Sequence, residues 1–304
     1  MIKFGKGGLF MLDFRIETFL CVCRHMNFTY AAEELHITQP AVSQHIHFLE
    51  DYYSAKLFER DGKKIKLTPS GEVLLKAMTV IRNDESAIKE NIKSSAQRKK
   101  VLRLGVTLTI GEYVIAKPIA EYIKNHPQTD IVIKFANTAQ LSSLILDGEL
   151  DIALVEGNFD TAAFDTCVYK TEKYIPVCSV KHRFAKPVRC LSDLLSERLI
   201  VRERGSGTRD ILEKNLELRN IRISDFLGYA EADNIHLIVS LVKNDCGISF
   251  LYKAAVCDEI EKGTLSEIKL SDFNIEHDFT FLWNRGSVFS HEYNEICEEL
   301  KNAN

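Results

Sequence analysis

The sequence contains no long hydrophobic run and no export signal. No apolar stretch in its 304 residues approaches the roughly 20 residues that a helix needs to span a bilayer. The first ten residues lack the apolar core and small-residue cleavage site of a secretory signal peptide. With 45% hydrophobic and 27% charged residues, the chain has the composition of a globular protein of two or three domains. We therefore expect a cytoplasmic protein with no membrane partner.

Paired cysteines are also missing. The eight cysteines, at positions 21, 23, 167, 178, 190, 246, 257 and 297, form no C-x-x-C pair and stand at no zinc-finger spacing from histidine. Scattered cysteines of this kind are ordinary reduced core residues of a cytoplasmic protein. A redox-sensing or metal-binding role is the less favoured alternative. The pattern thus predicts no metal site and no cofactor.

The motifs of the common enzyme classes are absent. There is no G-x-S-x-G elbow, no P-loop lysine and no H-E-x-x-H, and Gly205-Ser206-Gly207 falls short of a dinucleotide fingerprint. We therefore do not expect an enzyme, which turnover of a bound compound would reveal. Besides an enzyme, a second alternative to a ligand-binding protein is a DNA-binding architectural protein that binds no ligand. Ligand-dependent thermal shifts would exclude this alternative.

Charge is distributed unevenly along the chain, whose formal net charge is −4. Residues 11–100 hold 14 Lys and Arg against 12 Asp and Glu, whereas residues 101–304 hold 23 against 31. A mildly basic N-terminal part on an acidic body fits contact with nucleic acid through that part alone, although so small an excess does not establish it.

Three short helices are predicted near the N-terminus, over residues 13–25, over residues 28–35, and from residue 39 onward. Asn27 and Thr38 are suitable N-caps for the second and third helices. A two-residue turn joins these two helices. This arrangement is a helix-turn-helix.

The third helix has two unlike faces. At about 100° per residue, one side is apolar and consists of Val42, Ile46 and Leu49. The opposite side is polar and uncharged, and consists of Pro40, Ser43, Gln44 and His47. With Thr38 and Gln39 at the start of the helix, these are its candidate DNA-binding residues. Gln, Ser and His can read base edges in a major groove, whereas an ordinary solvated face, the alternative, usually carries Lys and Glu. His45 lies toward the core side, where we expect it to pack.

A hairpin and a long helix follow. Asp61-Gly62 marks a turn between two short strands, a wing with Lys63 and Lys64 at its tip, placed for phosphate contact. Pro69 then opens a helix with an apolar stripe, interrupted by Glu85, at Leu74, Met78, Ile81, Ile88 and Ile92. So narrow a stripe needs a partner helix, and the same helix of a second subunit is the simplest partner.

Residues 101–156 alternate between strand and helix. Strands are expected at 101–106, 130–135 and 150–155, and helices at 112–125 and 140–147. Such alternation implies a parallel sheet with helices on its faces, with ligands bound beyond the carboxyl ends of the strands. The candidate effector-binding residues at these ends are Thr107, Thr109, Asn137, Thr138 and Glu156.

A second unit follows, with strands near 173–180, 198–202, 228–231 and 247–251, before 279–283 returns to the first lobe. Its strand-to-helix turn at 202–209 offers free backbone N–H groups, and its small residues let an anion approach. The candidates here are Arg202, Ser206, Gly207 and Thr208, with further charge at Arg204 and Arg209. The alternative is a well-capped helix with solvated arginines. We expect a small anionic effector, an inorganic oxyanion or a short carboxylate, between the two lobes.

Two segments carry a family resemblance. NFTYAAEELHITQPAVSQHIHFLED and KLFERDGKKIKLTPSGE closely resemble the DNA-binding domain of LysR-type transcriptional regulators. The similarity extends from Met11 to about residue 300 and is strongest over 28–71. It implies that the DNA-facing residues include Gln39, Pro40, Ser43 and Gln44. This sequence departs from the family at Ser54, where glycine is usual, and in the ten residues before Met11.

The resemblance implies an α/β protein with a winged helix-turn-helix, a linker helix and a two-lobed effector domain resembling periplasmic binding proteins. The expected domains are an extension at 1–10, the DNA-binding domain at 11–68, the linker helix at 69–98 and the effector-binding domain at 99–304. Within the last, the first lobe comprises about 99–172 and 276–304, and the second about 173–275. The expected function is sequence-specific transcription regulation. The expected partners are double-stranded DNA, the effector, RNA polymerase and further copies of the chain, as a homodimer or homotetramer.

Overall fold

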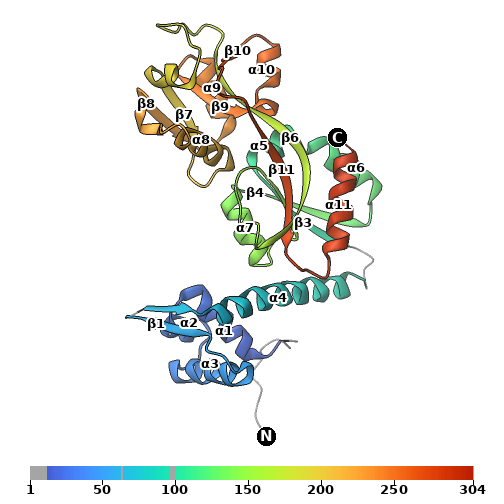
Figure 1. Cartoon of the computed structure of the whole chain (residues 1–304). Coiled ribbons are helices and arrows are strands. Elements are labelled where there is room, and N and C mark those ends of the chain that lie inside the picture. Colours follow the sequence, from blue (N-terminus) through green and yellow to red (C-terminus); the bar gives the residue numbers. More distant parts are fainter. Residues whose placement is uncertain (1–11, 63, 96–99, 304) are drawn as a thin grey trace. The chain divides into compact units, whose positions relative to one another are not determined.

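The computed structural model describes residues 12–62, 64–95 and 100–303. It divides into two compact units, residues 1–92 and 93–304, each with its own hydrophobic core (Figure 1). The expected N-terminal extension, Met11, Lys63 and the expected boundary between residues 98 and 99 lie outside the described residues.

The first unit is a winged helix-turn-helix followed by a long helix. Its elements are α1 (Phe14–His25), α2 (Phe28–Glu34), α3 (Gln39–Tyr53), β1 (Phe58–Asp61), β2 (Lys64–Leu67) and α4 (Pro69–Ser95). The Asn27 side chain accepts hydrogen bonds from two backbone amides of α2, and the Thr38 hydroxyl accepts one from the Ala41 amide. Both predicted N-caps are therefore confirmed. Val42, Ile46 and Leu49 lie in the core, as their spacing predicted.

Two turns of this unit use left-handed backbone. Ser54 ends α3 with φ of 50°, a conformation that glycine adopts at less cost. The departure from the family pattern therefore falls on a position where glycine would relieve strain. At the tip of the β1–β2 hairpin, Asp61 pairs with Lys64 and Gly62 has φ of 62°, which confirms the predicted hairpin.

The stripe along α4 is only partly covered. Leu74 is buried, Met78 and Ile88 are half-buried, and Ile81 and Ile92 are exposed. Exposed isoleucines at this spacing leave apolar surface for a second helix to cover.

The second unit is built on a nine-stranded sheet in the order β4-β3-β5-β11-β6-β9-β7-β8, with β10 also paired to β6. Its strands are β3 (Lys100–Val106), β4 (Thr129–Phe135), β5 (Ile152–Val155), β6 (Phe164–Ser179), β7 (Arg198–Arg202), β8 (Gly228–Ala232), β9 (Ile248–Tyr252), β10 (Leu265–Glu267) and β11 (Ile275–Asn284). Its α-helices are α5 (Leu108–Tyr113), α6 (Ala116–Asn125), α7 (Thr138–Leu146), α8 (Gly207–Glu217), α9 (Ile235–Lys243), α10 (Cys257–Glu261) and α11 (Ser290–Asn302).

Two long antiparallel strands join the lobes of this unit. Figure 1 shows β6 and β11 running side by side between the lobe of β3, β4 and β5 and the lobe of β7, β8 and β9. The strands within each of these two groups of three are parallel to one another. Each lobe thus presents carboxyl strand ends at which a ligand site can form.

Two expected elements are corrected by the structure. The strand expected from 173 begins at Phe164; over 165–172 most positions are polar and only Tyr169 is buried, so this half of the strand has little apolar signal. The helix expected over 112–125 is two helices, α5 and α6. The chain leaves helical geometry at Val114, where φ is −126°, and Val114 and Ile115 are both buried.

Candidate DNA-binding surface and effector site

The predicted DNA-facing residues share one surface of α3. Gln39, Pro40, Gln44 and His47 are exposed, as is the cap residue Thr38, while Ser43 is half-buried. The Gln39 amide nitrogen donates a hydrogen bond to the Ser43 hydroxyl over 2.9 Å. The surface therefore combines donors and acceptors without a net charge of its own, which suits base edges.

A groove of about 670 Å³ lies between this surface and the hairpin. Four predicted residues line it, namely Gln39, Ser43, His47 and Lys64. Sequence reasoning assigned no role in DNA contact to the other six polar residues of the lining, which are Asn27, Thr29, Glu50, Lys56, Glu59 and Arg60. Arg60 could have been noticed, because it precedes the predicted turn on the strand opposite the wing lysines.

Glu50 connects α3 to the start of the hairpin through hydrogen bonds. It is buried, and its carboxylate accepts hydrogen bonds from Lys56 Nζ over 2.6 Å and from the Leu57 amide over 3.0 Å. Burial opposes its charge, but these hydrogen bonds outweigh burial and hold the pKa of Glu50 below its usual value. Glu50 therefore positions the wing relative to α3, a role that no local sequence pattern signals.

His45 packs against α1 as predicted. Its Nδ1 lies 2.9 Å from the Thr18 hydroxyl, and its ring meets the edge of Phe14. Burial lowers the pKa of His45, with a smaller contribution from the positive charge of Arg15. A neutral imidazole is thus favoured between the two helices.

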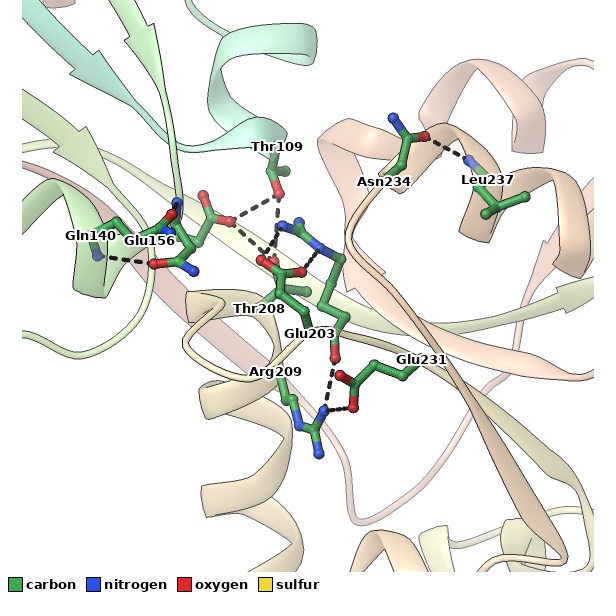
Figure 2. A network of polar contacts seen from close by, with 11 residues as sticks. Thr109, Gln140, Glu156, Glu203, Thr208, Arg209, Glu231, Asn234 and Leu237 are labelled. Carbon is green, nitrogen blue, oxygen red and sulfur yellow. Dashed lines mark hydrogen bonds and ion pairs between the residues drawn. The ribbon is translucent and has the colours of Figure 1, made fainter.

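A buried carboxylate lies at the centre of the candidate effector site. Glu156, directly after β5, accepts hydrogen bonds from Thr107, Thr109 and Thr208, with the last two donating to Oε1 over 3.0 Å each. Figure 2 shows Thr109 and Thr208 on either side of this carboxylate, on α5 and α8. Three of the hydroxyls that we expected to contact the effector therefore donate hydrogen bonds to Glu156.

The environment of Glu156 favours its neutral form. Burial raises the pKa of this carboxyl, and the three threonine hydroxyls and the charge of Arg202 only partly offset that effect.

The backbones of the two lobes touch beside this carboxylate. The Thr138 hydroxyl donates to the backbone carbonyl of Glu156, and a Cβ atom on Gly207 would lie 1.9 Å from that same oxygen. Any side chain at position 207 would clash with this carbonyl, which explains why residue 207 is a glycine.

Two buried donors near α8 have no hydrogen-bond partner among the described residues. One is Nη1 of Arg202, whose Nε and Nη2 pair with Glu203 over 2.8 and 3.1 Å. The other is the Ser206 hydroxyl, which occupies the N-cap position of α8 but makes no capping hydrogen bond. Unsatisfied buried donors are costly, so each of these two atoms would be stabilised by an acceptor.

The remaining candidates have structural partners. Asn137 accepts a hydrogen bond from the Gln140 amide and caps α7. Arg209 pairs with Glu213 over 2.8 Å and with Glu231 over 2.5 Å, and Figure 2 shows it turned toward Glu231. Arg204 is exposed. Of the three arginines in the turn, Arg202 alone is both buried and left with a donor that no described residue accepts.

The two units match two family models. Residues 15–72 match the bacterial regulatory helix-turn-helix protein of the lysR family, and residues 95–304 match the LysR substrate binding domain. This chain belongs to the LysR family of transcriptional regulators. LysR-type regulators combine DNA binding with an effector-binding domain, and they are not enzymes.

Curated relatives of this LysR-type regulator span most of its length. The HTH-type transcriptional regulator CysL of Bacillus subtilis is 26% identical over 269 residues, covering 88% of this chain and 89% of the relative. The uncharacterized HTH-type transcriptional regulator YeiE of Escherichia coli is 27% identical over 256 residues, covering 84% and 85%.

Solved structures share the fold. Full-length LysG of Corynebacterium glutamicum, with bound effector Arg, superposes with a TM-score of 0.63 at 16% identity, covering 96% of this chain and 98% of that one. The OxyR C206S mutant of the same organism, bound to H2O2, gives 0.60 at 22% identity, with 95% and 91% covered. The CcmR regulatory domain of Synechocystis in complex with 2-PG gives 0.60 at 20% identity, covering 67% of this chain and 97% of that domain. In the described part of the LysR-type regulator, no helix is long and apolar enough to cross a membrane.

Proposed function

We propose that this LysR-type regulator binds specific operator DNA and is switched by a small anion held between its two lobes. The observation that carries the anion is the pair of buried, unpartnered donors, Arg202 Nη1 and Ser206 Oγ. Both side chains are at most 3% exposed, so bulk water does not satisfy them.

The start of α8 adds further attraction for an anion. The first amides of a helix have no intrahelical acceptor, and the helix dipole places partial positive charge at that end. Ser206 leaves these amides uncapped, because its side chain makes no capping hydrogen bond. An oxyanion or a short carboxylate could therefore accept from the amides, from Ser206 and from Arg202 together.

Glu156 decides whether an anion is tolerated. An ionised carboxylate would repel the effector, whereas the neutral acid, which burial favours, would not. The threonine hydroxyls around Glu156 thus keep its orientation fixed, and the effector takes the donors that remain. A neutral effector is the competing possibility; LysG is bound to Arg and CcmR to 2-PG, so proteins of this fold differ in what they bind.

Calorimetry on the full-length protein tests the effector. We expect inorganic oxyanions or short carboxylates to bind and matched neutral compounds not to bind. Ser206→Ala should weaken anion binding about 10-fold or more, since a hydrogen bond to a charged group contributes about 1.5–3 kcal/mol. Arg204→Ala, an exposed change in the same turn, is the control and should leave affinity nearly unchanged. Binding of neutral compounds alone, or equal affinities in Ser206→Ala and the parent chain, would contradict the proposal.

For the DNA, we propose that Ser43, Gln44 and His47 read base edges and that the wing contacts phosphates. The exposed isoleucines of α4 would pair with a second copy, which gives a homodimer or a homotetramer able to read two half-sites. RNA polymerase is a further proposed partner, and the cytoplasm, where operator DNA lies, is the proposed site of action.

A further inference from the structure

A cluster of three metal-ligating side chains lies at the ends of α1 and α2. Among the described residues, Cys21, His25 and Glu34 form the one group of three such side chains whose ligand atoms all lie within 4.8 Å of one another. Cys21 and His25 are four residues apart and so share one face of α1, while Glu34 is the last residue of α2. The cluster contains a single cysteine, so no motif of paired cysteines marks it in the sequence.

Glu34 links the side chains around it through both of its carboxylate oxygens. His25 Nε2 lies 2.5 Å from Glu34 Oε2, and Arg24 pairs with the other carboxylate oxygen over 2.8 Å. The hydrogen bond from His25 lowers the pKa of Glu34, which keeps this carboxylate ionised. Burial, followed by the negative charge of Glu34, raises the pKa of the Cys21 thiol.

We propose that Cys21, His25 and Glu34 form a Zn²⁺ site. Sulfur, nitrogen and carboxylate oxygen are the donors that zinc takes, and three protein ligands leave the fourth tetrahedral position to solvent. Arg24 can stay on the far oxygen of Glu34 and orient it. The site is independent of the effector proposed above, because it lies wholly in the first unit.

Zinc at this site would join the ends of two helices that pack on the DNA-reading helix. Ala31 of α2, Val22 of α1 and Ile46 of α3 belong to one core. A ligand that binds only the folded arrangement stabilises it, so zinc should raise the thermal stability of the first unit. Because the bound sulfur must lose its proton, zinc affinity should increase with pH.

Cobalt(II) provides a direct probe in the reduced, full-length protein. Thiolate bonded to Co²⁺ gives a charge-transfer band in the near ultraviolet, and Zn²⁺ should displace it. Cys21→Ser should abolish this band. The matched control is Cys23→Ser, two residues away on the same helix, where burial raises the pKa of the thiol to about 12 and no carboxylate or imidazole partner is found within the described ranges. That variant should keep the band.

A second pair of variants guards against misfolding, since Cys21 lies in the core and its replacement can disturb packing. His25→Gln and Glu34→Gln change exposed side chains. Each should weaken Co²⁺ binding at least as much as loss of an outer-shell partner does, about 10- to 100-fold. The proposal is overturned if the parent chain shows no charge-transfer band with excess Co²⁺, if the band survives Cys21→Ser, or if both glutamine variants bind Co²⁺ as tightly as the parent.

Discussion

Thr208 of α8 donates a hydrogen bond over 3.0 Å to Glu156, which follows β5 in the other lobe. The two residues are 52 positions apart in sequence, and their contact joins the lobes through a buried carboxylate. Since the same carboxylate also accepts from Thr107 and Thr109, one side chain couples α8 to two positions at the start of α5. Changes at this point should therefore affect stability and effector response together.

Removing the cross-lobe hydroxyl should destabilise the second unit. We expect Thr208→Val, which keeps the shape of the side chain, to lower the free energy of unfolding by about 1–3 kcal/mol, because a buried acceptor loses a donor. Urea unfolding would measure the change. Thr171→Val, which removes an exposed hydroxyl from Asp278, is the control and should cost less. Equal losses would show that Glu156 does not depend on Thr208.

Glu156→Gln should alter the pH dependence of stability. Burial raises the pKa of Glu156 above its ordinary value of 4.5, so the folded state binds a proton more tightly than the unfolded chain. The stability linked to that proton is complete below pH 4.5 and is lost as the pH rises through the folded-state pKa. The Tm of Glu156→Gln should thus fall less with rising pH than the Tm of the parent chain, as thermal unfolding at several pH values would show. Parallel pH profiles would rule this out.

Base reading by α3 predicts sequence-selective losses. Ser43→Ala, Gln44→Ala and His47→Ala should each weaken operator binding by on the order of 1–3 kcal/mol and leave nonspecific binding nearly intact. Gel shifts on operator and scrambled DNA separate the two effects. Equal losses on both DNAs would mean that this face contacts only the backbone.

The wing should act through phosphates instead. Replacing Lys63 and Lys64 together by alanine should weaken binding to every sequence and flatten its salt dependence, since fewer counterions are released. Lys66→Ala is the control, because Lys66 pairs with Glu59 over 3.2 Å on the neighbouring strand. An unchanged salt slope for the double variant would remove the wing from the DNA contacts.

Placing a charge in the α4 stripe should split the assembly. Ile81→Asp would bury an unpaired carboxylate if Ile81 faces a second subunit, which is strongly unfavourable. Val73→Asp, on the same helix, 70% exposed and outside the stripe, should leave the assembly intact. Sedimentation velocity would compare the two, and an unchanged assembly in Ile81→Asp would reject this interface.

What the sequence predicted well depends on neighbours in the chain. Asn27 and Thr38 cap helices through amides two or three residues away, and Gly62 permits a turn within its own hairpin. Such features follow from local propensity and local hydrogen bonding. The apolar face of α3 was equally predictable, because its spacing alone assigns Val42 and Ile46 to the core.

What the sequence did not predict depends on contacts between distant segments. Glu156 could be singled out because it follows a strand, whereas the threonines that donate to it come from positions 47 to 52 residues away. In the sequence, Glu50 is one more charged residue near the end of a helix, and only the fold brings the Leu57 amide within hydrogen-bond distance of it. In both cases the partner is chosen by the fold, and the residue type alone fits several roles.

The order of the large sheet has a consequence for synthesis. β11 is synthesised after all the other described strands of this sheet, yet it lies between β5 and β6 in the middle of the sheet. Until residues 275–284 emerge, β5 and the first half of β6 lack their common neighbour and expose unpaired backbone edges. The second unit cannot close its sheet until β11 has been synthesised, so the unpaired edges of β5 and β6 are open to aggregation until then.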